Sequence, residues 1–207
     1  LKRNGELGER ISTMTIPKVL IDHHAQPDQV YDYVFWDVTA SASAEIVFDF
    51  IDNFDSPLLK DKAVATNLYA ALVTDCGLFK FPSTTSRTLA IASRLLESGI
   101  DNGLFNILLF DNFTENRLRY WGQCFHEKMR LIPELHLAII TIPKDELSQK
   151  KLKTSDLEGL AAFPLILEDI YLSAFFVERE KYVKISLRSK FDFPSNTMTR
   201  KYFNGGG

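Results

Sequence analysis

The chain has 207 residues, of which 45% are hydrophobic, and it carries two cysteines and a formal net charge of −3. This length and apolar content fit one large or two small globular domains and exclude a disordered chain, and the lack of an 18-residue apolar run excludes a membrane span. The acidic balance excludes the broad basic surface needed for duplex DNA, and two cysteines make no disulfide framework, which favours a reducing, cytoplasmic setting.

The first predicted strand is the apolar run 19–21, which follows Pro17 and leads directly into Asp22, His23 and His24. Such a run is typical of a buried strand in a parallel sheet, and ligands collect at the carboxyl ends of these strands. One acidic and two imidazole side chains at that position could bind a metal ion. The alternative is that the three residues only cap the strand and bond to nearby loops.

A second motif lies in residues 63–79, which are apolar and Ala-rich at helical spacing and deliver Asp75 shortly before Gly77. The carbonyl end of a helix carries partial negative charge, so it disfavours an isolated carboxylate there. A carboxylate that shares a cation is favoured at the same place. A solvated aspartate in a turn is the alternative interpretation.

The remaining pattern changes character near the middle of the chain. A short aromatic strand is predicted at 33–36, and helices are predicted at 42–53, 83–99, 102–110 and 114–129. The helix at 83–99 is expected to begin at a Ser83 cap, to end at Gly99 and to bury Leu89, Ala92 and Leu96. Strands are predicted next at 135–142, 170–179 and 182–188, with helices at 155–167 and from Asn196. The second half is therefore expected to be a smaller α+β domain on a mixed sheet.

Together these motifs resemble the DHH phosphoesterase superfamily, in the expected order along the whole chain. The resemblance extends to segments 41–47, 74–81 and 83–86, to Lys184–Ser189, and to the glycine run at 205–207. The subgroup that the chain most resembles is the nanoRNase and pAp-phosphatase (nanoRNase A-like) type rather than the larger RecJ exonucleases.

The resemblance implies an α/β catalytic DHH domain with a parallel sheet over residues 1–113, a connector helix at 114–130, and an α+β DHHA-type domain over 131–207. Family members also carry an H-x-x-P-D-x-D motif near their start and a histidine after the Gly-Gly-Gly run. Neither is found here. The chain is therefore expected to be an internal fragment that lacks the N-terminal strands of the catalytic domain.

The resemblance also implies roles for the four motif residues. His23 is expected to bind metal directly, and Asp75 to bind or bridge metal, so their side chains should converge. His24 would face the scissile phosphate as an acid or charge stabiliser, and Asp22 would orient an imidazole through its N–H. Two Mn²⁺ ions are expected, because mixed imidazole and carboxylate ligands suit that metal and paired ions suit phosphoester hydrolysis.

In the second domain, Arg188 follows a predicted strand, and a guanidinium group can bind a phosphate bidentately. Alone it could equally be a surface arginine, but the family match favours substrate binding. Gly205, Gly206 and Gly207 could form a backbone nest for an anion, or simply a flexible tail. Ser186 and Ser189 are expected to be supporting donors.

The function expected from the resemblance is a manganese-dependent phosphoesterase that hydrolyses short RNA oligonucleotides, 3′-phosphoadenosine 5′-phosphate, or both. Cyclic- or linear-dinucleotide phosphodiesterase and exopolyphosphatase activities are alternatives within the superfamily. A catalytically inactive nucleotide-binding module is the alternative of another class. The expected partners are short RNA or a small phosphorylated nucleotide, with no duplex DNA, no membrane and a possible homodimer.

Overall fold

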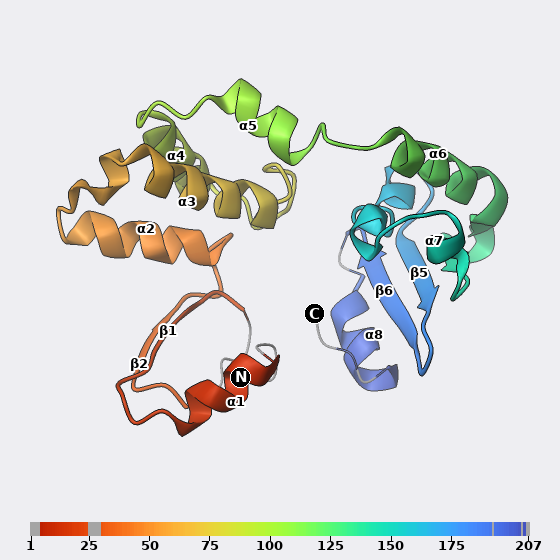
Figure 1. Cartoon of the computed structure of the whole chain (residues 1–207), viewed down its shortest axis with the longest axis horizontal. Helices are drawn as coiled ribbons and strands as arrows, with labels where there is room; N and C mark the ends of the chain where they lie inside the picture. Colours follow the sequence, from red (N-terminus) through yellow and green to blue (C-terminus); the bar gives the residue numbers. More distant parts are fainter. Residues whose placement is uncertain (1–4, 25–29, 192, 204, 206–207) are drawn as a thin grey trace. The chain divides into compact units, whose positions relative to one another are not determined.

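The computed structural model of the protein describes residues 5–24, 30–191, 193–203 and 205. It divides into two compact units, Leu1–Asp111 and Asn112–Gly207, and each has its own hydrophobic core (Figure 1). The first contains a parallel strand pair and the second a mixed sheet, so the expected mixed α/β class is confirmed. None of the described helices is both long and apolar enough to span a bilayer.

The sheet of the first unit is a pair of parallel strands. The described elements of this unit are α1 (Gly5–Thr13), β1 (Val19–Asp22), β2 (Tyr33–Trp36), α2 (Ser43–Asn53), the 3₁₀ turn η2 (Pro57–Lys60), α3 (Lys62–Asp75), α4 (Ser86–Leu96) and α5 (Asn102–Leu109). Strands β1 and β2 lie side by side (Figure 1) and pair in parallel, with Val19 opposite Tyr33 and Asp22 opposite Trp36. Asp22 thus ends the first strand, and the two histidines follow at its carboxyl end.

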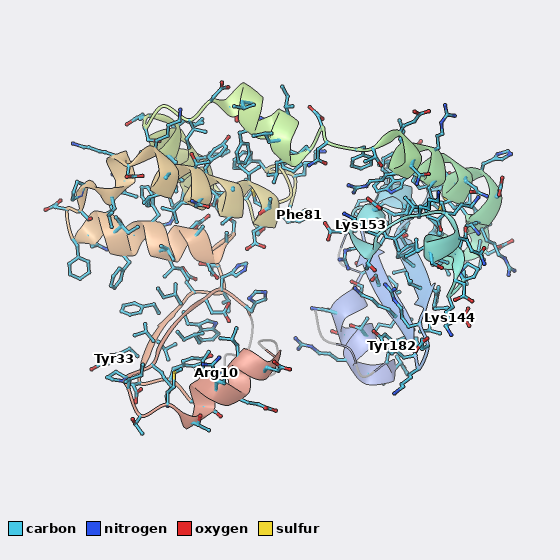
Figure 2. All side chains as sticks on the ribbon, viewed as in Figure 1. Arg10, Tyr33, Phe81, Lys144, Lys153 and Tyr182 are labelled. Atoms are coloured by element: carbon cyan, nitrogen blue, oxygen red, sulfur yellow. The ribbon has the colours of Figure 1, made fainter. Side chains whose placement is uncertain are left out.

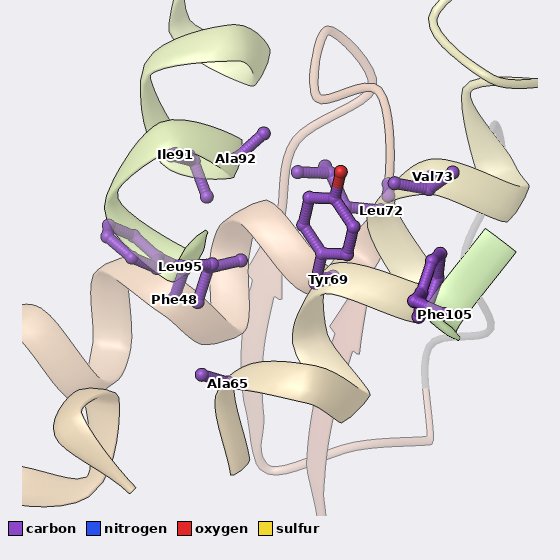
Figure 3. Packing of buried hydrophobic residues seen from close by; sticks show 11 residues of the cluster. Phe48, Ala65, Tyr69, Leu72, Val73, Ile91, Ala92, Leu95 and Phe105 are labelled. Atoms are coloured by element: carbon purple, nitrogen blue, oxygen red, sulfur yellow. The ribbon is translucent and has the colours of Figure 1, made fainter. Parts of the chain in front are cut away.

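The core of the first unit lies among its helices. Leu72 of α3 and Leu95 of α4 are completely or almost completely buried, and Phe48 of α2 packs into the same cluster (Figure 3). The ring of Tyr69 meets that of Phe105 edge-on at 5.0 Å between centroids, which fixes α3 against α5. These contacts hold the end of α3, and with it Asp75, in a defined place.

Helix α4 begins later and is rotated relative to the sequence prediction. Its N-cap is Thr85 rather than Ser83, because Thr85 and Thr88 form a reciprocal capping box at the helix start. The buried side chains of α4 are Thr88, Ile91, Ala92 and Leu95, whereas Leu89 is 51% exposed. The rotation follows from Thr88, which is completely buried because its hydroxyl bonds to Glu45 of α2.

The second unit is built on a four-stranded sheet in the order β3-β4-β5-β6, with a parallel pair in the centre and antiparallel pairs at both sides. Its described elements are α6 (Glu115–Gln123), the π-turn η3 (Cys124–Lys128), β3 (Arg130–Ile132), η4 (Pro133–Leu135), β4 (Leu137–Ile142), α7 (Glu146–Gln149), η5 (Thr154–Leu157), η6 (Phe163–Ile166), β5 (Leu172–Glu178), β6 (Val183–Ser189) and α8 (Ser195–Tyr202). The mixed sheet was expected, but the short edge strand β3 was not.

The segment predicted as a separate connector, 114–130, is part of the second unit. The chain divides after Asp111, and Tyr120, Trp121 and Cys124 are buried in the core of this unit. The indole Nε1 of Trp121 also donates to the carbonyl of Asp156 at 2.8 Å. The sequence pattern of an amphipathic helix between two domains does not show whether the helix connects the domains or packs into the core of one of them.

The helix predicted at 155–167 is replaced by the two short 3₁₀ turns η5 and η6. Gly159, between them, has φ +90°, which a helix cannot contain, and Pro164 lacks the N–H that a helix interior needs. A Cβ at Gly159 would lie 3.0 Å from the Trp121 ring, so the chain also approaches that indole closely. The apolar periodicity of this segment serves packing on the sheet rather than a helix.

Candidate active site

The Asp22-His23-His24 motif is organised around the carboxylate of Asp22. Its Oδ1 accepts from the backbone N–H groups of His23 at 2.8 Å and His24 at 3.1 Å, and it lies 2.7 Å from the His24 ring Nδ1. Burial acts to raise the pKa of Asp22, but the hydrogen bonds from His24 and His23 outweigh it and hold the pKa below its ordinary value. Asp22 is thus an anion that fixes the His24 ring.

His24 is also fixed from its backbone, and its ring stays half-exposed. The indole Nε1 of Trp36, on the neighbouring strand β2, donates to the His24 carbonyl at 2.8 Å. The side chain of His24 is 51% exposed, and its Nδ1 is occupied by Asp22. The ring therefore presents Nε2 outward, in a place where it can meet a ligand. This hydrogen bond from Trp36 was not predicted from the sequence.

The ring of His23 faces the carboxylate of Asp75, so that a ring nitrogen with a lone pair and a carboxylate oxygen lie opposite each other. The ring Nδ1 lies 3.1 Å from the carbonyl oxygen of Ala40, which can only accept, so Nδ1 carries the proton. The other ring nitrogen, Nε2, lies 3.2 Å from Oδ2 of Asp75. A neutral imidazole has a lone pair at Nε2, so this contact needs a cation between the two groups, either a proton or a metal ion.

The expected convergence of His23 and Asp75 is thus present in the structure, and the donor chemistry fits the metal that the sequence predicts. One imidazole nitrogen and one carboxylate oxygen suit Mn²⁺. Within the ranges that the structure describes, no group of three or more His, Cys, Asp or Glu side chains is arranged to hold a metal ion. His23 and Asp75 are therefore two ligands of a candidate site, and their metal-binding role stays a prediction.

A left-handed turn follows Asp75 and sets the position of its carboxylate at the end of α3. Gly77, Leu78 and Phe79 have φ of +59°, +59° and +61°. The N–H of Leu78 closes the helix by donating to the Val73 carbonyl at 2.8 Å. Such strain in residues other than glycine is maintained only where the surroundings impose it, and it is concentrated at functional sites.

Gly77→Ala is expected to lower the free energy of unfolding of the first unit by about 1–2 kcal/mol, because a left-handed residue with a Cβ is strained. The new Cβ would also lie 2.5 Å from the exposed ring of Phe81 (Figure 2), which must move. Urea denaturation measures the change. Gly103→Ala is the matched control, because Gly103 lies in helix α5 with no severe contact and should gain stability. Equal effects in both variants would contradict this explanation.

In the second unit, the predicted substrate residues Arg188 and Ser186 line one hollow of about 220 Å³. Strand β6 alternates its side chains, so Lys184, Ser186 and Arg188 lie on the same face. Arg188 is anchored through Nη1, which donates to the Leu187 carbonyl at 2.8 Å. The role of Lys184 as a lining residue was not predicted from the sequence, although its alternation with Ser186 and Arg188 along the strand could have identified it.

Arg179 also lines the hollow, and it too was not predicted from the sequence. It follows β5, and its Nη2 donates to Thr154 Oγ1 at 3.3 Å. Together with Lys184 and Arg188 it makes this hollow rich in cationic groups, against the single carboxylate of Glu158 in its lining. The hollow therefore has the charge that an anionic ligand requires.

Of the other predicted substrate residues, Ser189 lies outside this hollow, and the glycine run is described only at Gly205. The hydroxyl of Ser189 donates to the Phe193 carbonyl at 2.9 Å and lies 3.0 Å from Ser195 Oγ, so it holds the start of α8 and does not line the hollow. Gly205 donates its N–H to the Thr199 carbonyl at 3.2 Å. Gly206 and Gly207 lie outside the described residues.

No family model matches the chain. The bifunctional oligoribonuclease and PAP phosphatase NrnA of Bacillus subtilis is 29% identical over 205 residues, which cover 96% of this chain and 64% of that protein. The protein of the same name from Thermus thermophilus is 27% identical over 90% of this chain and 55% of its own length. The chain thus spans less than two thirds of the length of these relatives.

A solved structure shares the fold over the whole chain. The crystal structure of an exopolyphosphatase-related protein from Bacteroides fragilis superimposes with a TM-score of 0.92 at 29% identity, and covers 100% of this chain and 60% of that one. With the relatives named above, it confirms the resemblance to the DHH phosphoesterases.

Proposed function

We propose that this chain, as a relative of the DHH phosphoesterases of NrnA type, is part of a manganese-dependent enzyme that hydrolyses short RNA oligonucleotides and 3′-phosphoadenosine 5′-phosphate. The observation that carries this proposal is the opposition of His23 Nε2 and Asp75 Oδ2 at 3.2 Å, with the His23 Nδ1 proton directed at the Ala40 carbonyl. This is the arrangement that a metal-binding imidazole and a carboxylate ligand require.

His23 and Asp75 would hold the metal, since they provide a nitrogen lone pair and an anionic oxygen from two separate elements. When bound, paired divalent ions acidify a water molecule and relieve the negative charge of the phosphoryl oxygens. The carboxylate of Asp75 balances part of the added positive charge. The left-handed turn after α3 keeps it at the helix end, where the helix carbonyls add further negative potential.

His24 is proposed to act on the phosphate itself. Its Nδ1 is held by Asp22 at 2.7 Å, which leaves Nε2 as the ring atom that can donate to or accept from a phosphoryl oxygen. Because Asp22 also binds both histidine backbone N–H groups, it fixes the direction of this imidazole before substrate arrives. Such fixed orientation is what general acid catalysis requires.

The second unit is proposed to bind the part of the substrate remote from the cut. Arg188 would bind a phosphate of the nucleotide, and Ser186 would add a hydroxyl donor in the same hollow. The cations Lys184 and Arg179 support this assignment, because they give the hollow an excess of positive charge. Gly205 is not included in this anion site, because its N–H already donates to the Thr199 carbonyl.

An inactive nucleotide-binding module is the second candidate. It is favoured by the observation that the described residues bring together only His23 and Asp75, and no group of three metal ligands. Such a module would bind nucleotides through the cationic hollow and would release no product.

A substrate panel on the full-length protein separates these functions. Purified protein with Mn²⁺ would be given a diribonucleotide, a five-nucleotide RNA, 3′-phosphoadenosine 5′-phosphate, a cyclic dinucleotide and inorganic polyphosphate. The expected products are mononucleotides from RNA and AMP plus phosphate from the bisphosphate, and Asp75→Asn should abolish both. Nucleotide binding without hydrolysis would favour the inactive module, and preferential hydrolysis of polyphosphate or of the cyclic dinucleotide would contradict the proposed substrates.

A further inference from the structure

An exposed aromatic ring follows Asp75 in a place that the proposed chemistry does not use. Phe81 lies beside the end of α3 and is 55% exposed (Figure 2). Phe79, in the same turn, packs instead against the helical core of the first unit. A single exposed phenylalanine is common on protein surfaces, so what matters is how this ring is held.

The backbone of Phe81 is fixed on both sides by hydrogen bonds. Its N–H donates to the Cys76 carbonyl at 3.1 Å, and its carbonyl accepts from the N–H of Thr84 at 3.0 Å. Cys76 is completely buried, so this turn is anchored in the core of the first unit. The ring is therefore presented by a closed turn and not by a loose loop.

The turn is also strained. Leu78 and Phe79 are left-handed, with φ of +59° and +61°, a conformation that is unfavourable for residues with a Cβ. Together with Gly77 at φ +59° they reverse the chain, so that Phe81 returns to lie against Gly77. Backbone strain of this kind is concentrated at functional sites. Besides the position of Asp75, its result here is the position of the Phe81 ring.

One face of the ring is turned to Gly77, and the opposite face is open. A Cβ built at Gly77 would lie 2.5, 2.6 and 2.8 Å from Cζ, Cε1 and Cε2 of Phe81. These distances are nearly equal, as they are above the face of a ring, whereas opposite the ring edge Cζ would be much the nearest atom. Only a glycine permits this approach. The ring thus rests on the backbone of Gly77 and presents its outer face to solvent.

A flat aromatic surface in this place suits a nucleobase. Bases stack on exposed aromatic rings at single-stranded nucleic-acid sites, and such contacts tolerate any sequence. Gly77 is the second residue after Asp75, so their Cα atoms are at most about 7.6 Å apart, a distance of the same order as that between a base and its own phosphate. Lys80, also exposed, adds positive charge to the same turn, as such sites require.

We infer that Phe81 is a base-stacking residue, and that the outer face of its ring binds the nucleobase next to the phosphate that His23 and Asp75 would hold. Stacking needs no hydrogen bond to the base, so the contact accepts short RNA of any sequence. That the stacked base belongs to a hydrolysed substrate rests on the proposed function. The stacking itself can be tested with a nucleotide that is a product of the proposed reaction.

The test compares adenosine 5′-monophosphate with ribose 5-phosphate, which lacks only the base. Their dissociation constants on the full-length protein with Mn²⁺ are measured by titration calorimetry. The wild-type protein should bind the nucleotide roughly tenfold more tightly. Phe81→Leu keeps an apolar side chain but has no ring, so it should weaken binding of the nucleotide roughly tenfold and leave that of ribose 5-phosphate unchanged. Phe81→Tyr keeps the ring and should bind both ligands as the wild type does.

Phe54→Leu is the matched control, because Phe54 is 70% exposed in the same unit, at the end of α2 far from Ala40 and His23. It should change neither dissociation constant. Urea denaturation checks that the variants are folded. If Phe81→Leu does not fold, Phe81→Met makes the same comparison, since methionine is also apolar and has no ring.

Three results would each overturn the inference: equal affinity of the wild type for the two ligands, unchanged nucleotide affinity in Phe81→Leu, or an equal loss of both ligands in that variant. The last would mean that Phe81 acts on the fold or on the phosphate. Failure of the proposed function gives a different result. Nucleotide affinity would still depend on Phe81, while the wild-type protein hydrolysed neither RNA nor 3′-phosphoadenosine 5′-phosphate.

Discussion

His23→Ala should remove most of the bound Mn²⁺ and with it nearly all phosphoesterase activity, because Nε2 of His23 is one of the two candidate ligands that meet at 3.2 Å. His24→Ala should keep the metal and still lower kcat by about 10²- to 10⁴-fold, the usual contribution of a positioned acid or base. The difference arises because His24 is bound to Asp22 and directs Nε2 outward. Metal analysis of the purified variants beside steady-state kinetics measures both quantities.

The matched control for these variants is His126→Ala, which removes an exposed imidazole from the π-turn η3 in the other unit. It should change neither metal content nor kcat. Equal metal loss in His23→Ala and His24→Ala would show that both histidines are ligands, and the division of roles between them would have to be abandoned.

Arg188→Ala should lower kcat/KM for a diribonucleotide by about 10- to 100-fold, which corresponds to the loss of one or two hydrogen bonds from a charged donor. Both kcat and KM should change, because a phosphate bound far from the cut also positions the scissile bond. The small ester bis-(p-nitrophenyl) phosphate should be hydrolysed at nearly the wild-type rate, because it can reach the metals without being bound by Arg188. Parallel kinetics with Mn²⁺ on both substrates test this difference.

Arg119→Ala serves as the control for Arg188→Ala, since Arg119 is 77% exposed in α6 and pairs with Glu115 on the same helix. It should affect neither substrate. A loss with the generic ester as large as that with the dinucleotide would mean that Arg188 belongs to the fold or to the metal site, and the division of labour between the units would be wrong.

The sequence predicted the parts of the site that have a direct chemical signature. The apolar run before Asp22 predicted the strand β1, and the helical spacing before Asp75 predicted α3, so the meeting of His23 with Asp75 could be expected from the two motifs together. The expectation that β1 is buried was wrong, because Val19 is 52% exposed and the rest of the strand is only half-buried. The Ala40 carbonyl could not be predicted, because every residue has a carbonyl and only the tertiary structure selects one. The burial of Thr88 was not predicted either, since a polar residue on a helix is usually exposed.

The errors in the second unit come from residues whose positions depend on tertiary contacts. The apolar residues of 155–167 suggested a helix, but Gly159 and Pro164 break it, and the tertiary contact with Trp121 explains why a glycine is needed there. Arg179 and Lys184 were given no role from the sequence, because only the pairing of β5 with β6 brings them to one hollow with Arg188. Sheet pairing is long-range information that local periodicity does not contain.

The chain has two tryptophans, and the structure gives one to each unit. Trp36 is 46% exposed and binds the His24 carbonyl, whereas Trp121 is 7% exposed in the core of the second unit. Each unit therefore has its own source of intrinsic tryptophan fluorescence. With either indole replaced by phenylalanine, the emission of the other reports separately on occupancy beside the histidine pair or on melting of the four-stranded sheet, and neither signal needs an attached dye.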